Sequence, residues 1–259
     1  MFDYSYLVEI LTPMRSGKQP DKEKWDLFAG KYQKTLAAGC GLSVPDNPMG
    51  RPRYSLVEMI QRCDLPVDTE KTVMNLNTFH EKKELDDRLN TAAALRIKYV
   101  LVIRGDGGPA LSKLDPKSIG GNLSVATTMD LLRYINREYV DLFVTGAAFN
   151  QYNPISFESD RLKQKVDAGA KFVITQPVIG KDPNVDLLEA FGMPVVVEAW
   201  MSINVDLLLK SVGRKTDKDH EAYDPTKNLQ VLHDAYPGQC VYLSMLSFKE
   251  DWKAMLPRM

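Results

Sequence analysis

The sequence predicts an α/β protein, a single (β/α)8 barrel of the TIM type that spans residues 1–259. Eight short apolar segments alternate with segments of helical periodicity, a pattern that requires a mostly parallel sheet. The chain also provides about thirty residues for each of the eight units, which is the usual size of a strand and helix in a closed barrel. No side-chain signature repeats between units, and no linker or low-complexity segment divides the chain.

The predicted strands are apolar runs, rich in branched residues, that end at Gly, Pro or polar positions. The fourth is the clearest, because Tyr99-Val-Leu-Val-Ile103 leads directly into Arg104-Gly-Asp106. A strand of this kind is buried on both faces, and the charged residues after it must face a cleft or a partner. In chain order, the predicted strands are 6–11, 41–45, 72–77, 99–103, 141–146, 171–176, 193–198 and 240–245.

The segments between the strands carry apolar residues at helical spacing. Ser55, followed three residues later by Glu58, forms the sequence signature of a capping box at a helix start. Gly39, Gly169 and Gly192 close three of the helices. The predicted helices are 21–38, 55–63, 81–95, 127–138, 157–168, 185–191, 205–212, 229–236 and 248–256, with irregular loops at 107–122 and 147–154.

The composition indicates a water-soluble globular protein, with 44% hydrophobic and 26% charged residues. The formal net charge of -1 does not support nucleic-acid binding, and the charged stretch 214–221 mixes both signs as a solvated loop does. No apolar run is long enough to span a bilayer, and the first residues lack the pattern of a signal peptide. We therefore expect a cytoplasmic protein without membrane contact.

Cysteine and histidine usage argues against a disulfide framework and against a bound metal. The three cysteines are odd in number and far apart, which favours reduced thiols (Cys40, Cys63 and Cys240). The three histidines show no spacing typical of metal ligands (His80, His220 and His233).

Polar residues gather at the carboxyl ends of the predicted strands, where barrel enzymes build their sites. They are Glu9, Asn75, Asn77, Asp106, Gln176 and Glu198. Together they predict a polar cup for a heteroaromatic, hydrogen-bonding ligand, although some could be satisfied core residues or caps. Trp200 has two open interpretations, a stacking surface for a ligand ring or a packing residue at the barrel rim.

A second pattern near the fourth strand, Gly105-Asp-Gly-Gly-Pro-Ala110, fits the dinucleotide fingerprint GxGxxA. Pro109 and the irregular loop behind it do not open an amphipathic helix, so the helix N-terminus that would bind the pyrophosphate is missing. The barrel is therefore favoured over a Rossmann fold.

Four segments resemble the methylenetetrahydrofolate reductase family, and they span nearly the whole chain. Val8-Glu-Ile-Leu-Thr-Pro13 is similar to the family's first strand, which holds a catalytic glutamate. Val102-Ile-Arg-Gly-Asp106 is similar to its Leu-Arg-Gly-Asp strand end, and Val241-Tyr-Leu-Ser-Met245 to its last strand. The most specific match is Lys165-Val-Asp-Ala-Gly-Ala170 with Phe172-Val-Ile-Thr-Gln176.

The resemblance implies a (β/α)8 barrel that binds FAD and reduces methylenetetrahydrofolate with NADH or NADPH as donor. It implies that Glu9 is the general acid for the bridging nitrogen and that Asp106 binds the pterin and stabilises the cationic iminium. Gln176 would bind the pterin edge, with Asn75 and Trp200 as further substrate-binding candidates. The flavin would contact Arg104, Gly105 and Lys165.

The sequence departs from the resembled family mainly at flavin positions. Asn153 and Phe149 stand where the family has His and Tyr, Asn75-Leu-Asn77 replaces His-Leu-Thr, and Gln164 replaces a basic residue. Ser247-Phe248 stands where the family often has an Arg for the folate tail. Two alternatives therefore stay open: a flavin-free, folate-dependent methyltransfer protein, and a non-catalytic subunit that binds a partner reductase. A homo-oligomer is also possible on this sequence.

Overall fold

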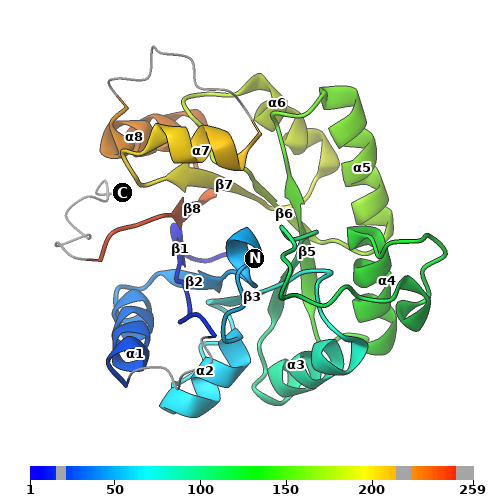
Figure 1. Ribbon diagram of the computed structural model, residues 1–259. Coiled ribbons are helices and arrows are strands. Elements are labelled where there is room, and N and C mark those ends of the chain that lie inside the picture. Colours follow the sequence, from blue (N-terminus) through cyan, green and yellow to red (C-terminus); the bar gives the residue numbers. More distant parts are fainter. Residues whose placement is uncertain (16–21, 214–222, 249–259) are drawn as a thin grey trace.

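A computed structural model describes residues 1–15, 22–213 and 223–248 of the chain. The strands form one closed parallel barrel in the order β1 to β8, and β8 pairs with β1 (Figure 1). They are β1 Tyr6–Glu9, β2 Gly41–Val44, β3 Thr72–Leu76, β4 Tyr99–Val102, β5 Val144–Phe149, β6 Phe172–Thr175, β7 Val195–Trp200 and β8 Cys240–Ser244. The predicted barrel is therefore confirmed.

The helices form a ring outside the strands (Figure 1). The α-helices are α1 Lys22–Ala37, α2 Leu56–Cys63, α3 Lys82–Ala94, α4 Thr128–Glu138, α5 Ile155–Asp167, α6 Pro183–Asp186, α7 Val205–Ser211 and α8 Pro225–Ala235. Three short 3-10 helices are η1 Pro48–Gly50, η2 Pro116–Ile119 and η3 Leu187–Phe191. The capping box at α2 is confirmed, because Ser55 and Glu58 each accept the other's backbone N–H. Within the described ranges, no helix combines the length and apolarity that a membrane crossing needs.

The fifth strand differs from the prediction of 141–146. It begins at Val144 and continues to Phe149, whereas Asp141 adopts a left-handed φ of 61°. Ala147 and Ala148 were predicted as the start of a loop, but in the barrel they continue the strand, and Gly146 before them makes room for an aromatic neighbour. A Cβ on Gly146 would lie 2.3 Å from the Phe172 ring, so the small residue is required inside the strand.

The seventh strand also runs further than predicted. β7 ends at Trp200, so Glu198 lies within the strand, opposite Tyr242 of β8. The Trp200 side chain is 5% exposed and packs in an apolar cluster with α7. Its indole N–H donates to the Asn204 carbonyl oxygen at 3.1 Å. The structure therefore supports Trp200 as a packing residue and not as a stacking surface, because almost none of its surface is open to a ligand.

Most other elements differ from the prediction only at their ends. The helix predicted at 185–191 is divided into α6 and η3, and the helix predicted at 229–236 begins at Pro225. The predicted loop at 214–221 and, apart from Phe248, the predicted helix at 248–256 lie outside the described residues.

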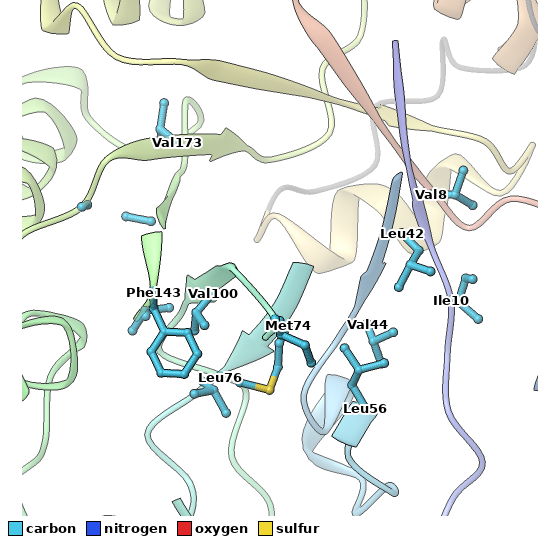
Figure 2. Packing of buried hydrophobic residues seen from close by; sticks show 14 of the residues in the cluster. Val8, Ile10, Leu42, Val44, Leu56, Met74, Leu76, Val100, Phe143 and Val173 are labelled. Atoms are coloured by element: carbon cyan, nitrogen blue, oxygen red, sulfur yellow. The ribbon is translucent and has the colours of Figure 1, made fainter. Parts of the chain in front are cut away.

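Alternate residues along the strands supply two apolar regions. One lies between the barrel and the helices and includes Val8, Leu42, Val44, Leu56 and Met74 (Figure 2). The other fills the barrel interior and includes Leu7, Tyr99, Phe172, Val196 and Tyr242. Because side chains alternate along a strand, the residue two positions after an interior residue also faces the interior. Glu9 follows Leu7, and Glu198 follows Val196, in this way.

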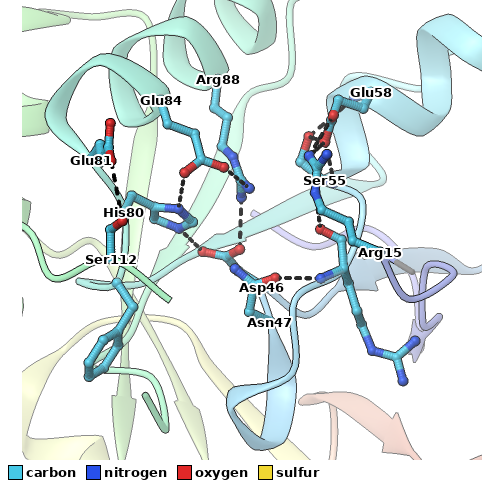
Figure 3. Close-up of polar contacts among 12 residues, drawn as sticks. Arg15, Asp46, Asn47, Ser55, Glu58, His80, Glu81, Glu84, Arg88 and Ser112 are labelled. Atoms are coloured by element: carbon cyan, nitrogen blue, oxygen red, sulfur yellow. Dashed lines mark hydrogen bonds and ion pairs between the residues drawn. The ribbon is translucent and has the colours of Figure 1, made fainter. Parts of the chain in front are cut away.

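A buried polar cluster joins β2 and β3 to α3 (Figure 3). Asp46, just after β2, accepts hydrogen bonds from His80 Nε2 at 2.5 Å and from the Arg88 guanidinium at 2.8 Å. The Asn77 backbone N–H donates to the same carboxylate at 3.0 Å. Glu84 lies 2.7 Å from Arg88 and 3.4 Å from His80. The cluster anchors the start of the segment 46–55, which leads to the barrel mouth.

The charges in this cluster compensate one another. Burial opposes ionisation of Asp46, but His80 and Arg88 hold its pKa below the ordinary value. Burial also opposes protonation of His80, but Asp46 and Glu84 raise its pKa. The hydrogen bond from His80, helped by the Arg88 charge, lowers the pKa of Glu84 to about 2. The carboxylates of Asp46 and Glu84 each contact both Arg88 and His80, so each buried charge has a partner.

Removal of Asp46 tests whether this cluster is structural. Asp46→Ala leaves Arg88 and His80 buried without their shared carboxylate, so we expect a loss of ~3–5 kcal/mol in the free energy of unfolding. Urea denaturation measures it. Glu138→Ala, which removes an exposed pair with Arg137, is the control and should cost less than ~1 kcal/mol. Equal losses for the two variants would contradict the structural role.

Candidate functional site

A cavity of about 530 Å³ opens at the carboxyl ends of β4, β5 and β6. This is the end at which (β/α)8 barrels build their sites. Five of the predicted site residues line it: Arg104, Gly105, Asp106, Lys165 and Gln176. Three others do not line it: Glu9, Asn75 and Trp200. The wall also contains Pro48, Asn150, Asn153, Phe157, Glu158 and Arg161.

Asp106 lies exposed in the turn after β4, and its carboxylate accepts the Met49 backbone N–H at 2.6 Å. This contact depends on a close approach of two loops. A Cβ on Gly50 would lie 1.6 Å from the Gly107 carbonyl oxygen, and one on Gly108 would lie 2.1 Å from the Gly50 carbonyl oxygen. The loops therefore touch backbone to backbone, and glycine at these positions is what holds Asp106 beside Met49.

Arg104 and Gly105 are held from below by the end of β3. The Thr78 backbone N–H and hydroxyl both donate to the Arg104 carbonyl oxygen, at 3.3 and 2.9 Å. Gly105 has a φ of 81°, and a Cβ there would lie 2.7 Å from the Asn77 side chain. The Arg104 side chain is exposed and makes no ion pair with any described residue. Its backbone is thus rigidly placed, while its guanidinium is open to a ligand.

Lys165 of α5 lies buried at the cavity wall. Its ammonium group donates to the Ala148 carbonyl oxygen at 2.6 Å and pairs with Glu158 at 3.3 Å. Burial lowers the pKa of Lys165, and the Glu158 carboxylate opposes this effect. Glu158 also accepts the Asn153 side-chain amide at 2.9 Å and the Asn150 backbone N–H at 3.3 Å. The pair therefore shapes the loop between β5 and α5.

Gln176 follows β6 and is held through its backbone. Its N–H donates to the Phe149 carbonyl oxygen at 2.9 Å, and its own carbonyl oxygen accepts the Gln151 amide at 2.8 Å. The side chain of Gln176 lines the cavity and has no hydrogen bond to the parts of the chain that the structure describes. Its amide is therefore available to a ligand that offers both a donor and an acceptor.

Glu9 lies inside the barrel, half-buried at the end of β1. Its carboxylate accepts the Tyr242 hydroxyl at 3.0 Å and, more weakly, the Met245 backbone N–H at 3.4 Å. Removal from water raises the pKa of Glu9 above its ordinary value, although these hydrogen bonds and the Arg53 charge oppose the rise. A carboxyl group in this setting holds its proton to higher pH than a solvated one, as a general acid requires.

Asn75 belongs to the same interior network as Glu9. The Ser43 hydroxyl donates to the Asn75 side-chain oxygen at 2.9 Å. Ser43 also hydrogen-bonds Tyr242, which in turn contacts Glu9. The polar cup thus has two parts, the cavity around Asp106 and the interior network around Glu9.

Sequence reasoning missed several residues that organise the site. Tyr242 lies 233 positions from Glu9 along the chain, and Asp46 lies 34 positions from His80. The only available signal was the spacing of four residues between His80, Glu84 and Arg88, which places Glu84 and Arg88 on one face of α3 and His80 just before its start. Neither the Tyr242 contact nor the glycine contact at Gly50 has a local signature.

The cavity wall carries charges and surfaces that suit an anionic, planar ligand. Arg161, like Arg104, forms no ion pair among the described residues, and its guanidinium stacks 5.4 Å from the Phe157 ring centroid. The Phe157 side chain is 52% exposed. Unpaired guanidinium groups bind phosphates, and an exposed ring stacks on a planar heterocycle. These residues therefore offer positive charge for phosphate groups and an aromatic surface for a planar ring.

The arrangement joins four chemical capacities. Glu9 can donate a proton from the barrel interior, while Asp106 can stabilise positive charge at the mouth. Gln176 can fix the hydrogen-bonding edge of a ring. Arg104 and Arg161 can neutralise phosphate groups. Acid, carboxylate and cations of this kind suit the reduction of a nitrogen heterocycle by a phosphate-bearing cofactor.

Comparison with known proteins agrees with these capacities. The profile of the family described as methylenetetrahydrofolate reductase matches residues 41–197. A rice protein (Oryza sativa subsp. japonica) named "Probable methylenetetrahydrofolate reductase (NADH)" is 32% identical over 121 residues, or 41% of this chain and 20% of the relative. A Caenorhabditis elegans protein named "Probable methylenetetrahydrofolate reductase (NADPH)" is 29% identical over 123 residues, or 46% and 17%. The matched segments thus cover a fifth or less of these relatives.

Solved structures support the fold. The dihydropteroate synthase of Yersinia pestis superposes with a TM-score of 0.51 at 14% sequence identity, covering 98% of this chain and 89% of that protein. At this identity the likeness concerns the barrel architecture and not the site.

Substitution of Gly50 tests the loop contact that positions Asp106. In Gly50→Ala the new Cβ meets the Gly107 carbonyl oxygen, and alanine must adopt the left-handed φ of 66°. We expect a loss of ~1–3 kcal/mol in the free energy of unfolding, measured in urea.

The matched control is Gly30→Ala in α1, where a Cβ has nothing within 4 Å. Alanine favours a helix interior over glycine, so this variant should gain up to ~1 kcal/mol. The same chemical change therefore has opposite signs at the two sites, and a gain for Gly50→Ala would contradict the close contact.

Proposed function

The chain belongs to the methylenetetrahydrofolate reductase family, and from this premise we propose that it reduces 5,10-methylenetetrahydrofolate to 5-methyltetrahydrofolate. The proposal includes FAD as the bound cofactor and NADH or NADPH as the electron donor. The name of the rice relative gives NADH and that of the nematode relative gives NADPH, so an experiment must decide between the two donors.

One observation carries the proposal: Glu9 is an acid held inside the barrel, within hydrogen-bond distance of Tyr242 and next to the mouth. In the proposed reaction Glu9 gives its proton to the bridging nitrogen of the folate. The carbon–nitrogen bond then breaks, and the methylene carbon becomes part of a cationic iminium. A raised pKa favours this role, because the acid must be protonated near neutral pH.

Asp106 and Gln176 supply binding and charge stabilisation in this proposal. The Asp106 carboxylate is kept in place by the Met49 N–H, and it would stabilise the iminium charge and bind donors of the pterin. The open amide of Gln176 would bind the pterin edge. Asn75 contributes through Ser43 and Tyr242 to the placement of Glu9. We assign no ligand contact to Trp200, because its side chain is buried.

The cavity wall would hold the cofactor. Arg104 and Arg161 would bind the phosphates. The Lys165 ammonium group, which Glu158 and the Ala148 carbonyl oxygen hold in place, would lie at the same wall. Gly105 lets the chain turn tightly past Asn77, which brings its backbone to the wall. A bound flavin supplies hydride transfer between the nicotinamide and the folate.

The two half-reactions test the proposal, observed by visible absorption after addition of FAD. We expect the wild-type chain to bind FAD, the flavin band to bleach with NADH or NADPH, and methylenetetrahydrofolate to restore it. In Glu9→Gln the nicotinamide should still bleach the flavin, but re-oxidation by the folate should slow at least ~100-fold, because the general acid is missing. Glu189→Gln, at an exposed position of η3, is the control and should behave as wild type.

Two outcomes would change the assignment. If the chain binds folate but no flavin and oxidises no nicotinamide, the folate-dependent methyltransfer protein becomes the better account. If it binds neither ligand but co-purifies with a reductase, the non-catalytic subunit does. Unchanged re-oxidation in Glu9→Gln would remove Glu9 from the mechanism.

A further inference from the structure

A second carboxylic acid lies beside Glu9 in the barrel interior. Glu198 of β7 stands opposite Tyr242 of β8, and the Tyr242 hydroxyl donates to Glu9 at 3.0 Å. Ser244, whose hydroxyl donates to the Ala199 carbonyl oxygen at 3.2 Å, also lies beside Glu198. The next residue, Met245, gives its N–H to Glu9. Ser244, the last residue of β8, and Met245, which follows it, thus connect the two carboxyl groups.

The surroundings of the pair contain no cation in contact with either carboxyl group in the part of the chain described. Glu9 receives hydrogen bonds from Tyr242 and Met245, and the charge that acts on it from further away is Arg53. Arg53 is itself engaged with the Thr12 carbonyl oxygen and is close to a second cation, Arg51. Among the described residues, the other titratable group that faces the pair is the Tyr242 phenol.

Two carboxylates in a low-dielectric interior repel each other when both are ionised. We propose that Glu9 and Glu198 form a pair that shares one proton near neutral pH, with Glu198 as the positioning residue that keeps this proton available to Glu9. The idea deepens the proposed function and rests on it for the use of the proton. Neither the resemblance nor the comparisons assign a role to Glu198.

The electrostatics of the three groups agree with this pairing. Removal from water raises the pKa of Glu198 well above its ordinary value, and the charge of Glu9 raises it further. Burial and the charges of both glutamates raise the pKa of Tyr242, which therefore stays a neutral hydrogen-bond donor. Because the proton belongs to the pair, its two apparent pKa values describe the pair and not one residue.

The pair has a consequence for the proposed reaction. When Glu9 gives its proton to the folate nitrogen, one O–H bond breaks, one N–H bond forms, and the pair gains one negative charge. The doubly charged pair is unfavourable, so it recovers a proton from solvent before the next turnover. Without Glu198, Glu9 would lose its proton at lower pH and would be less often ready to act as an acid at neutral pH.

The titration of the carboxyl groups tests the pair directly, by NMR of the chain labelled with 13C at the glutamate side-chain carboxyl. In the wild type we expect two coupled steps, the upper one well above the ordinary range of a glutamate. In Glu198→Gln we expect a single step for Glu9, with its acid dissociation constant raised at least ~ten-fold relative to the upper step. Glu9→Gln should lower the apparent pKa of Glu198 in the same way, because the coupling is reciprocal.

The reductase reaction provides the second readout. Activity should fall with rising pH as Glu9 loses its proton. In Glu198→Gln this fall should occur at lower pH, by the same shift that the titration of Glu9 shows. Glu189→Gln should move neither titration nor profile. If Glu9 titrates identically in the wild type and in Glu198→Gln, the proposal that the two residues share a proton is wrong. If the coupling is present but no folate is reduced, the proposed function fails while the pair remains.

Discussion

The arrangement depends on one constraint: Glu9, a carboxylic acid, is held inside the barrel above a layer of apolar side chains. Leu7, Tyr99, Phe172 and Val196 fill the interior below it and exclude water. Above this layer the alternation of the strands continues with Glu9, which can remain there because Tyr242 and Met245 donate to it. The free-energy cost of ionisation in this place is what gives the group a raised pKa, so the packing of the barrel and its proposed chemistry have one origin.

The rim of the site is held by contacts that lie outside the barrel interior. Asp46 joins β2 and β3 to α3, and from it the segment 46–55 reaches the turn after β4, where Gly50 touches Gly107. Asp106 is fixed only where these two loops meet. The stability of the buried Asp46 cluster and the position of the Asp106 carboxylate are thereby linked.

Much of this could be predicted from local sequence. Strand–helix alternation predicts the barrel, and the apolar run before Arg104-Gly-Asp106 predicts a buried strand with charges at its mouth. Local patterns ended the fifth strand at Gly146, whereas it continues to Phe149, and they could not show that the small size of Gly146 serves Phe172 of the next strand. They left two interpretations of Trp200 open, because burial against α7 has no signal in the strand itself. Tyr242 and Asp46 act on partners far along the chain, which no local pattern reveals.

The central claim is that the polar cup binds a reduced folate with its pterin between Asp106, Gln176 and Glu9. A crystal structure of the chain with 5-methyltetrahydrofolate tests it most directly. The account predicts pterin hydrogen bonds to the Asp106 carboxylate and the Gln176 amide, with the Glu9 carboxyl group facing the nitrogen that carries the proton. A folate bound elsewhere on the chain, or a cup that stays without folate at saturating concentration, would contradict it.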